Sequence, residues 1–469
     1  MKRKITYKTV EIQKLELGRV LATLVGAVTV AIDVAKEAIV AGLADEVGKT
    51  HALVRFSHPR QTELFFAMVE RIRELGRTVA VVLEPTGTYS TPFVHHMRAR
   101  GFEVFRVDPK AAHDIAAVLD GVSSQHDAKS CTLIAYLHAQ GLSKPWHEQT
   151  PQQRKARALV KEHALYSKPA QKLYGQLEAI SAACWPELNA MLETRSQWYL
   201  HLLLAYPGAN AVAAADPEEV RALLRRVSSG LLSSERVEEV LRTSKTTLGA
   251  PLDEAEQEYL RALTTELLRL RAGTAMVVKK LRAFVSSAGD EALARVAEVV
   301  GPACAVAIFS DLGNPTSYGS AAALEKGCGL NLREKSSGKH QGKLSITKRG
   351  SPRVRHLLYM AALRMLLESP AARAWYERRS AYRAGLRKKA VVALMRKIIR
   401  ALFHVARGSA FDAGKLFDSR VLPPDSPAPH TDPPAAAPVK KSRAGKAMSP
   451  TSARSRRSRP VEQNTSSAP

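Results

Sequence analysis

Residues 25–56, VGAVTVAIDVAKEAIVAGLADEVGKTHALVRF, decide the fold of the first part of this 469-residue chain. Three short runs rich in valine, isoleucine and alanine follow one another: VGAVTVAIDV, EAIVAGLA and HALVRF. Polar or glycine-containing turns separate them. The pattern predicts three strands in hairpin order, because β-branched side chains suit a pleated surface and short turns reverse the chain.

Beyond these strands, helix and strand signals alternate. HPRQTELFFAMVERIRELG (58–76) predicts a helix that stops at a glycine, and TVAVVLE (78–84) predicts a strand that ends before a proline. A helix over TYSTPFVHHMRARG (88–101), a strand at EVFRV (103–107) and two more helical stretches follow. After a polar, basic lead-in over residues 1–24, the chain is therefore expected to form an α/β domain with a mixed sheet over residues 25–150.

Residues 151–290 have a helical pattern. Its clearest signal is an apolar seam with steps of three and four and one polar member, which is typical of a coiled coil: Leu260, Leu263, Leu267, Leu270, Thr274, Val277, Leu281 and Phe284. A second stripe lies earlier, at Tyr166, Leu173, Leu177, Ile180 and Cys184. Heptads alone do not name the partner, so an antiparallel hairpin within one chain and a dimerisation arm both remain open.

The last third of the chain predicts a second compact unit and a tail. Residues 291–408 have helical patterns around a loop rich in glycine and lysine. Residues 409–469 are rich in proline, alanine and serine and then in lysine and arginine, with little to bury, so we expect them to be disordered. The tail either contacts phosphates without specificity or is a dispensable extension.

The charge balance predicts a polyanionic partner. Lysine and arginine number 70 and aspartate and glutamate 44, a formal net charge of +26, which favours nucleic acid or an anionic membrane. The longest apolar run, Val20 to Ile32, is 13 residues, whereas a membrane-spanning helix needs ~20. Four scattered cysteines without a CxxC pair favour a reducing compartment over disulfides or zinc. We therefore expect a cytoplasmic protein.

Three acids of the first domain stand where a metal site could form. Asp33 lies inside the first strand, Glu84 ends a later strand, and Asp127 opens a helix. Carboxylates brought together would repel one another unless a divalent cation neutralised them, and Mg²⁺ suits such an all-oxygen site. Singly, each acid has an ordinary alternative: a strand-ending turn, a helix cap for Glu84, and an N-cap for Asp127.

The second unit carries a basic loop with serines at its centre, within GCGLNLREKSSGKHQGKLSITKRGSPRVRHLLYMAALRML (327–366). Serine among cations could attack phosphorus, because the cations would stabilise the developing charge. It could equally be a phosphate-contacting loop whose serine bonds a backbone oxygen. The basic residues expected to bind nucleic acid are Arg333, Lys335, Lys339, Lys343, Lys348, Arg349, Arg353 and Arg355.

The order of the motifs resembles a known family. AIDVAK (31–36), LEPTGTY (83–89), HDAKSCTLIA (126–135), GPACAVAIFSDLGNPTSYGSAAALEKGCGL (301–330), SSGK (336–339) and ITKRGSPRVRHLLYMAA (346–362) occur in this order. Together they resemble the DEDD-type transposases of the insertion sequence 110 family. The resemblance runs from about residue 28 to residue 408.

That resemblance implies a RuvC-like domain of RNase H fold, a coiled-coil insertion and a mostly helical transposase domain. It implies a DNA recombinase of the bacterial nucleoid, guided by a structured bridge RNA, with two Mg²⁺ ions. It also implies a site shared between protomers, hence a homodimer or homotetramer. Asp33, Glu84 and Asp127 match the family's first three acids, and Ser337 matches the serine that joins covalently to DNA.

The chain departs from the family pattern at the fourth acid. Where the family has D-x-x-D-A-x-x-I-A, this chain has D-A-K-S-C-T-L-I-A, so Ser130 takes the acid's place. Aspartates three residues apart would share one helix face. Serine adds no charge, so binding of a second ion should weaken. In another alignment register, Asp114 or Asp120 could substitute for the fourth acid. An active transposase, a RuvC-like nuclease or junction resolvase, and a catalytically impaired nucleic-acid-binding relative therefore remain as alternatives.

Overall fold

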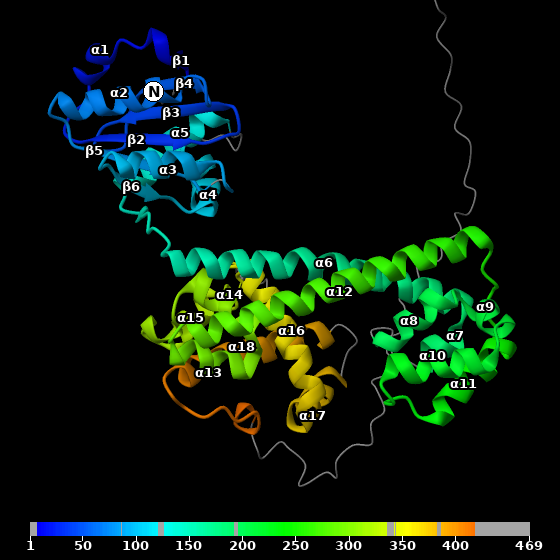
Figure 1. Cartoon of the computed structure of the whole chain (residues 1–469). Helices are drawn as coiled ribbons and strands as arrows, with labels where there is room; N and C mark the ends of the chain where they lie inside the picture. Colours follow the sequence, from blue (N-terminus) through cyan, green and yellow to red (C-terminus); the bar gives the residue numbers. More distant parts are fainter. Residues whose placement is uncertain are drawn as a thin grey trace, which may run out of the picture. The chain divides into compact units, whose positions relative to one another are not determined.

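The computed structural model describes residues 7–85, 87–120, 126–191, 196–334, 342, 344–381 and 386–417, with the side chains of 117–120 and 191 left out. The chain forms two compact units that divide between Gln152 and Gln153 (Figure 1). Each unit has its own apolar core and is described by itself.

The first unit is built on a seven-stranded mixed sheet in the order β1-β4-β3-β2-β5-β6-β7. Its strands are β1 (Val10–Glu11), β2 (Val28–Asp33), β3 (Ala38–Ala44), β4 (Thr50–Ser57), β5 (Val79–Leu83), β6 (Glu103–Arg106) and β7 (Lys144–Pro145). Strands β2, β3 and β4 form the predicted antiparallel hairpins, and β5 and β6 add in parallel beside β2. The mixed-sheet α/β prediction is confirmed.

Residues of the predicted lead-in take part in this sheet. β1 pairs in parallel with β4, and the short helices η1 (Ile12–Lys14) and α1 (Leu17–Leu21) follow it. Ile12 and Leu21 are buried in the same core as the central strands. The first unit therefore begins by Val10 rather than near residue 25.

Helices cover both faces of the sheet, and β2 shows which side chains face which layer. Val28, Val30 and Ile32 pack in the core that includes α2 (Thr62–Glu74) and α3 (Ser90–Ala99). Ala31 packs in the core that includes α4 (Pro109–Asp120) and α5 (Asp127–Ala139). Because side chains alternate along a strand, Asp33 belongs to the α5 face.

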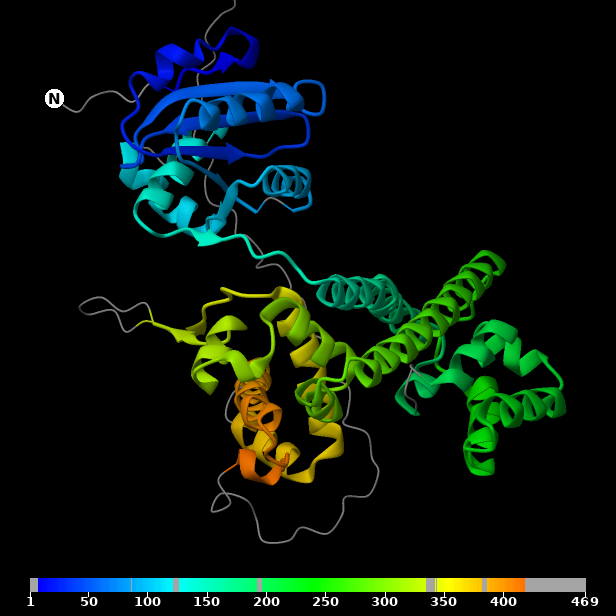
Figure 2. The same ribbon diagram turned by 60° about the vertical axis from the view of Figure 1, so that its left-hand side comes forward.

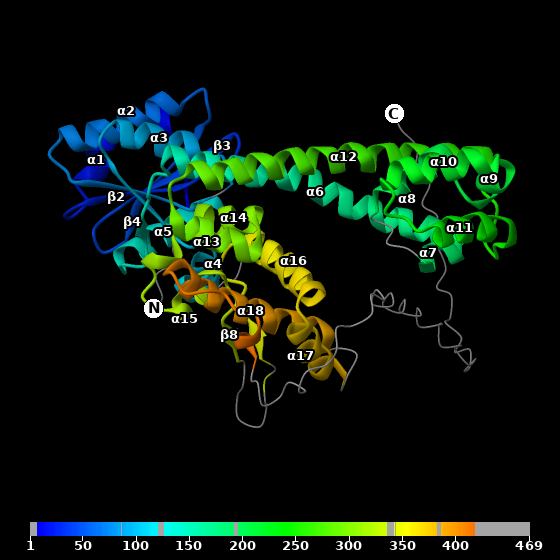
Figure 3. The same cartoon turned by 60° about the horizontal axis from the view of Figure 1, so that its bottom comes forward.

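Two 34-residue helices, α6 (Pro151–Cys184) and α12 (Glu254–Ser287), lie side by side in the second unit (Figures 1 and 3). They are antiparallel, because Glu162 pairs with Lys280 at 2.7 Å while the later Tyr174 contacts the earlier Arg271. A Cβ on Gly273 would lie 2.4 Å from the ring of Tyr166, so glycine permits this close approach. The apolar seam thus forms a hairpin within one chain.

Among the described residues, five short helices connect α6 to α12: α7 (Pro186–Met191), α8 (Gln197–Ala205), α9 (Ala209–Ala214), α10 (Pro217–Ser228) and α11 (Ser234–Thr246). They pack around Trp185 and Tyr199, which are fully buried, and share their core with the apolar side chains of α6 and α12. A second core forms around the other part of the hairpin.

The remaining helices make that second core: α13 (Glu291–Val300), α14 (Pro302–Leu312), α15 (Ala321–Gly327), α16 (Pro352–Glu368), α17 (Pro370–Ala381) and α18 (Leu386–Ala406). Shorter elements are η2 (Pro315–Ser317), β8 (Leu332–Arg333), β9 (Ser345–Ile346) and η3 (Gly414–Leu416). The buried carboxylate of Glu325 on α15 accepts hydrogen bonds from Arg396 and Arg400 on α18. Two cations of α18 therefore serve the fold.

The predicted start of the tail, at residue 409, is too early in the chain. Phe417 is buried, and its ring lies 5.3 Å from that of Trp375, so residues just beyond 409 pack on the core. Residues 418–469, which carry the basic part of the tail, lie outside the described residues, and their disorder stays a prediction. Within the described part of the chain, no helix is both long and apolar enough to cross a membrane.

Candidate active site

Two of the predicted acids lie beside each other at the carboxyl ends of parallel strands. Asp33 is the last residue of β2, and Glu84 directly follows β5. The register pairs Ile32 with Leu83, so the next residue on each side brings Asp33 level with Glu84. Neighbouring strands are about 4.8 Å apart, and both side chains are half-buried. The sheet therefore juxtaposes two carboxylates.

Helix α5 brings the third acid to the same edge. It packs tightly on β3, where the Cys131 thiol donates a hydrogen bond to the Val40 carbonyl at 3.1 Å. A Cβ on Gly42 would be 3.3 Å from the Cβ of Cys131, so glycine gives the helix room. The N-cap is His126, whose Nδ1 accepts from the Lys129 amide at 3.3 Å. Asp127 is thus the exposed first residue of the helix and not its cap.

The acids lie within one another's electric field. The pKa of Asp33 is raised by burial and then by the charge on Asp127. The pKa of Glu84 is raised by burial and then by the charges on Asp33 and Asp108. Burial and like charge both disfavour the ionised carboxylate, and a bound cation would reverse both effects. Asp33 therefore lies within the electrostatic range of both Glu84 and Asp127, and the role of the three acids as metal ligands stays a prediction.

Ser130, at the position of the missing fourth acid, contacts this group directly. It lies one turn after Asp127, and its hydroxyl donates a hydrogen bond to the Asp33 carboxylate, which lowers the pKa of Asp33 against the two raising effects. The serine thus stabilises the ionised form of Asp33 without adding a carboxylate.

A fourth carboxylate that sequence reasoning missed comes from β6. The Val107 amide donates to the Leu83 carbonyl at 3.1 Å, which holds the chain after β6 against the end of β5. Asp108 follows at once, and its charge reaches Glu84. The signal was present in EVFRVD, an acid directly after a strand, as at Glu84. Of the proposed substitutes, Asp114 pairs with Lys110 at 3.3 Å, and the side chain of Asp120 lies outside the described residues.

The chemistry of this donor set fits a hard divalent cation, because carboxylate oxygens are the ligands that Mg²⁺ prefers. The carboxylates nevertheless lie farther apart than the ligands of one bound cation would. Across the described residues, no three histidine, cysteine, aspartate or glutamate side chains come close enough together to hold an ion. The acids are coupled through charge, Asp33 with Asp127 and Glu84 with both Asp33 and Asp108.

The serine loop connects β8 to β9, which pair antiparallel with Arg333 opposite Ser345 (Figure 2). Ser337 lies outside the described residues, as do Lys335, Lys339 and Lys343. The segments leading to the loop touch backbone to backbone. A Cβ on Gly329 would lie 2.7 Å from the Arg349 amide nitrogen, and one on Gly350 would lie 2.2 Å from the Gly327 oxygen. Only glycine permits this crossing.

The described basic residues near the loop divide into two groups. Arg333, Lys348 and Arg349 are exposed. Arg355 instead donates to the backbone oxygens of Gly350 and Cys328, at 2.8 and 3.1 Å, and burial lowers its pKa. Arg353 pairs with Asp311 at 3.3 Å. The first three are exposed to solvent, whereas the last two donate to groups within the fold.

Two family models match the chain. The model for DEDD transposases of IS110 elements, described as "Transposase", matches residues 30–185, which contain Asp33, Glu84, Asp127 and Ser130. The model described as "Transposase IS116/IS110/IS902 family" matches residues 293–377, which contain Ser337. No curated protein matches the chain.

Proposed function

This chain belongs to the IS110 family of DEDD transposases, and we propose that it cuts and rejoins DNA through a covalent link between Ser337 and DNA. The observation that supports this most directly is the placement of Asp33, which lies level with Glu84 at the strand ends and within the electric field of Asp127. Acids grouped in this way can hold a cation beside a reacting phosphate.

In the proposed reaction, Asp33, Glu84 and Asp127 hold a divalent cation, Mg²⁺ by its preference for oxygen ligands. When bound, this cation supplies positive charge to the reacting phosphate. The hydroxyl of Ser337 attacks phosphorus, so a serine–phosphate ester forms and one bond from phosphorus to a deoxyribose oxygen breaks. The serine proton ends on that oxygen, which leaves as a DNA hydroxyl.

Rejoining is the reverse reaction with a different DNA end. A hydroxyl of the new end attacks the serine–phosphate ester, the bond from Ser337 to phosphorus breaks, and the proton returns to the serine. Each phosphodiester broken is thus replaced, so no ATP is consumed. The exposed Arg333, Lys348 and Arg349 would contact phosphates beside the loop.

Two further partners belong to the proposal through family membership: a structured bridge RNA that selects the DNA, and a second copy of the chain. In the proposed homodimer or homotetramer, the acids of one protomer act with Ser337 of another. The formal net charge of +26 suits binding of both nucleic acids.

The hydrogen bond from Ser130 to Asp33 supports a second candidate function. With a hydroxyl in place of a carboxylate, the site has one charge less with which to hold a second cation. A protein that binds DNA and RNA but recombines weakly would follow. A RuvC-like nuclease that uses water in place of Ser337 is the other alternative.

The test compares wild type with Ser337→Ala, Asp33→Asn and a matched control, Ser336→Ala. Supercoiled donor and target DNA are incubated with Mg²⁺ and RNA transcribed from the DNA flanking the gene. Covalent adducts are scored on denaturing gels and strand exchange by sequencing. We expect wild type and Ser336→Ala to form adducts and recombinants, and the other two to form neither. Cleavage that survives in Ser337→Ala would establish the nuclease, and wild type no better than Asp33→Asn would establish the impaired relative.

A further inference from the structure

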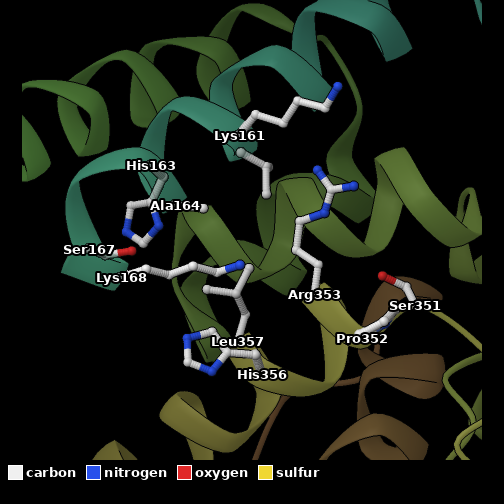
Figure 4. A pocket seen from close by; sticks show the side chains of 11 residues that line it. Lys161, His163, Ala164, Ser167, Lys168, Ser351, Pro352, Arg353, His356 and Leu357 are labelled. Atoms are coloured by element: carbon white, nitrogen blue, oxygen red, sulfur yellow. The ribbon is translucent and has the colours of Figure 1, made fainter. Parts of the chain in front are cut away.

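A cavity of about 610 Å³ lies between α6 and the first turn of α16, within the second unit (Figure 4). None of its residues belongs to the acid site of the first unit. The residues that line it are Val160, Lys161, His163, Ala164, Ser167, Lys168, Ser351, Pro352, Arg353, His356 and Leu357. Volumes from about 300 to 1,000 Å³ are usual for small-molecule sites.

The lining of this cavity is strongly basic. Lys161, His163 and Lys168 come from α6, and Arg353 and His356 face them from α16 (Figure 4). None of the eleven described lining residues is acidic. Basic side chains gathered in this way repel one another, although Arg353 also pairs with Asp311 beside the lining. An anion in the cavity would reduce that repulsion.

Burial and then a neighbouring charge act on each of the two imidazoles in the lining. The pKa of His163 is lowered by burial and then by the charge on His356, and the pKa of His356 is lowered by burial and then by the charge on Lys168. Cations thus disfavour protonation on both sides of the cavity. A bound anion would remove that effect.

A buried acid fixes the wall without neutralising the cavity. The side chain of Asp311 on α14 is 6% exposed and accepts a hydrogen bond from the Ser351 hydroxyl at 2.6 Å. Its carboxylate also pairs with Arg353 at 3.3 Å and with Arg157 of α6 at 3.4 Å. One carboxylate therefore meets two guanidiniums, and α6, α14 and α16 are tied together at one end of the cavity. The site is held in shape before any ligand binds.

We propose that this cavity binds a phosphate ester of about the size of one nucleotide. The cations supply recognition of phosphate, and the volume exceeds what phosphate alone would fill. Val160, Ala164 and Leu357 provide apolar surface for the sugar part. The phosphate ester can come from the backbone of a nucleic acid or from a free mononucleotide.

The inference goes beyond the proposed function, because it needs neither Ser337 nor the acids of the first unit. It requires no bridge RNA and no cleavage. Of the cavity residues, only Arg353 was predicted from sequence to bind nucleic acid. A phosphate held here would link α6 of the hairpin to α16, the helix that follows the serine loop.

The test uses the full chain and the double variant Lys161→Gln/Lys168→Gln. The matched control, Lys155→Gln/Lys172→Gln, makes the same charge change at exposed positions of the same helix, outside the cavity. Both lysines of the cavity are exposed as well, so neither double variant removes buried contacts. Circular dichroism checks that both fold as wild type does.

Two probes distinguish the sources of the phosphate. Adenosine 5′-monophosphate is titrated by calorimetry, with adenosine as the uncharged comparison, and a fluorescent 12-nucleotide single strand is titrated by anisotropy. We expect the cavity variant to bind about tenfold more weakly and the control less than about twofold more weakly. For the single strand, the salt slope should fall by about one.

Loss of affinity for both probes supports a site open to free nucleotides, and loss for the single strand alone supports a backbone site. Equal weakening in cavity and control variants overturns the proposal, because it indicates diffuse attraction. Adenosine binding as tightly as the monophosphate, or neither charged probe binding wild type, also overturns it. Since no recombination is measured, these outcomes are independent of those for Ser337.

Discussion

Restoring an acid at position 130 should make the stability of the first unit depend on a divalent cation. Ser130→Asp removes the hydrogen bond that the hydroxyl donates to Asp33 and places a further carboxylate beside Asp33 and Asp127. A hydrogen bond to a charged group contributes about 1.5–3 kcal/mol. Without metal, Ser130→Asp should lose at least that much stability, and like-charge repulsion adds to the loss.

Ser130→Ala is the matched control, since it removes the hydrogen bond and adds no charge. It should lose about 1.5–3 kcal/mol whether or not Mg²⁺ is present. Ser130→Asp should instead recover in Mg²⁺, because its added carboxylate is a further ligand. A cation present at a hundred times its dissociation constant stabilises the folded state by about 2.7 kcal/mol.

Amide hydrogen exchange of the full chain measures this locally, through peptides that cover β2 and α5. In EDTA we expect wild type to be the most protected from exchange, Ser130→Ala to be less protected and Ser130→Asp to be the least protected. In 10 mM Mg²⁺, on the order of a hundred times a submillimolar dissociation constant, Ser130→Asp should rise above Ser130→Ala. If Mg²⁺ protects the two variants equally, position 130 does not contribute to a metal site, and the reasoning fails.

Two further predictions concern acids with different roles. Asp108→Asn should lower the pKa of Glu84, because the charge on Asp108 raises it. The ionised form of Glu84 is lost as pH falls through its raised pKa, so in Asp108→Asn the acidic limb of the pH profile of Mg²⁺-dependent cleavage should move to lower pH. Asp114→Asn is the control and should leave this limb unchanged. An unchanged limb in Asp108→Asn would contradict the prediction. Glu325→Gln leaves Arg396 and Arg400 without their buried partner and should cost about 3–5 kcal/mol in urea unfolding; a loss below about 1 kcal/mol would contradict this.

Local patterns in the sequence determined the elements of the first unit and identified its candidate acids. Short runs rich in β-branched residues predicted β2, β3 and β4, and the order of motifs predicted the family. Asp33 could be chosen because a charge inside an apolar strand needs a partner, and Glu84 because it ends a strand. These features are local, since neighbouring residues along the chain determine both the spacing of apolar side chains in a strand and where the strand ends.

Contacts between distant elements were decided only by the tertiary structure. The strand register places Asp33 level with Glu84. Close packing of α5 at Gly42 places Ser130 within hydrogen-bonding distance of Asp33. Asp108, which follows β6, lies near enough for its charge to act on Glu84. The apolar seam of α12 did not reveal whether its partner helix belongs to the same chain. The close approach of Gly273 to Tyr166 shows that it does. The basic cavity likewise joins α6 to α16, far apart in sequence. Periodicity specifies which face of an element is buried, whereas the packing of side chains from distant segments decides what that face meets.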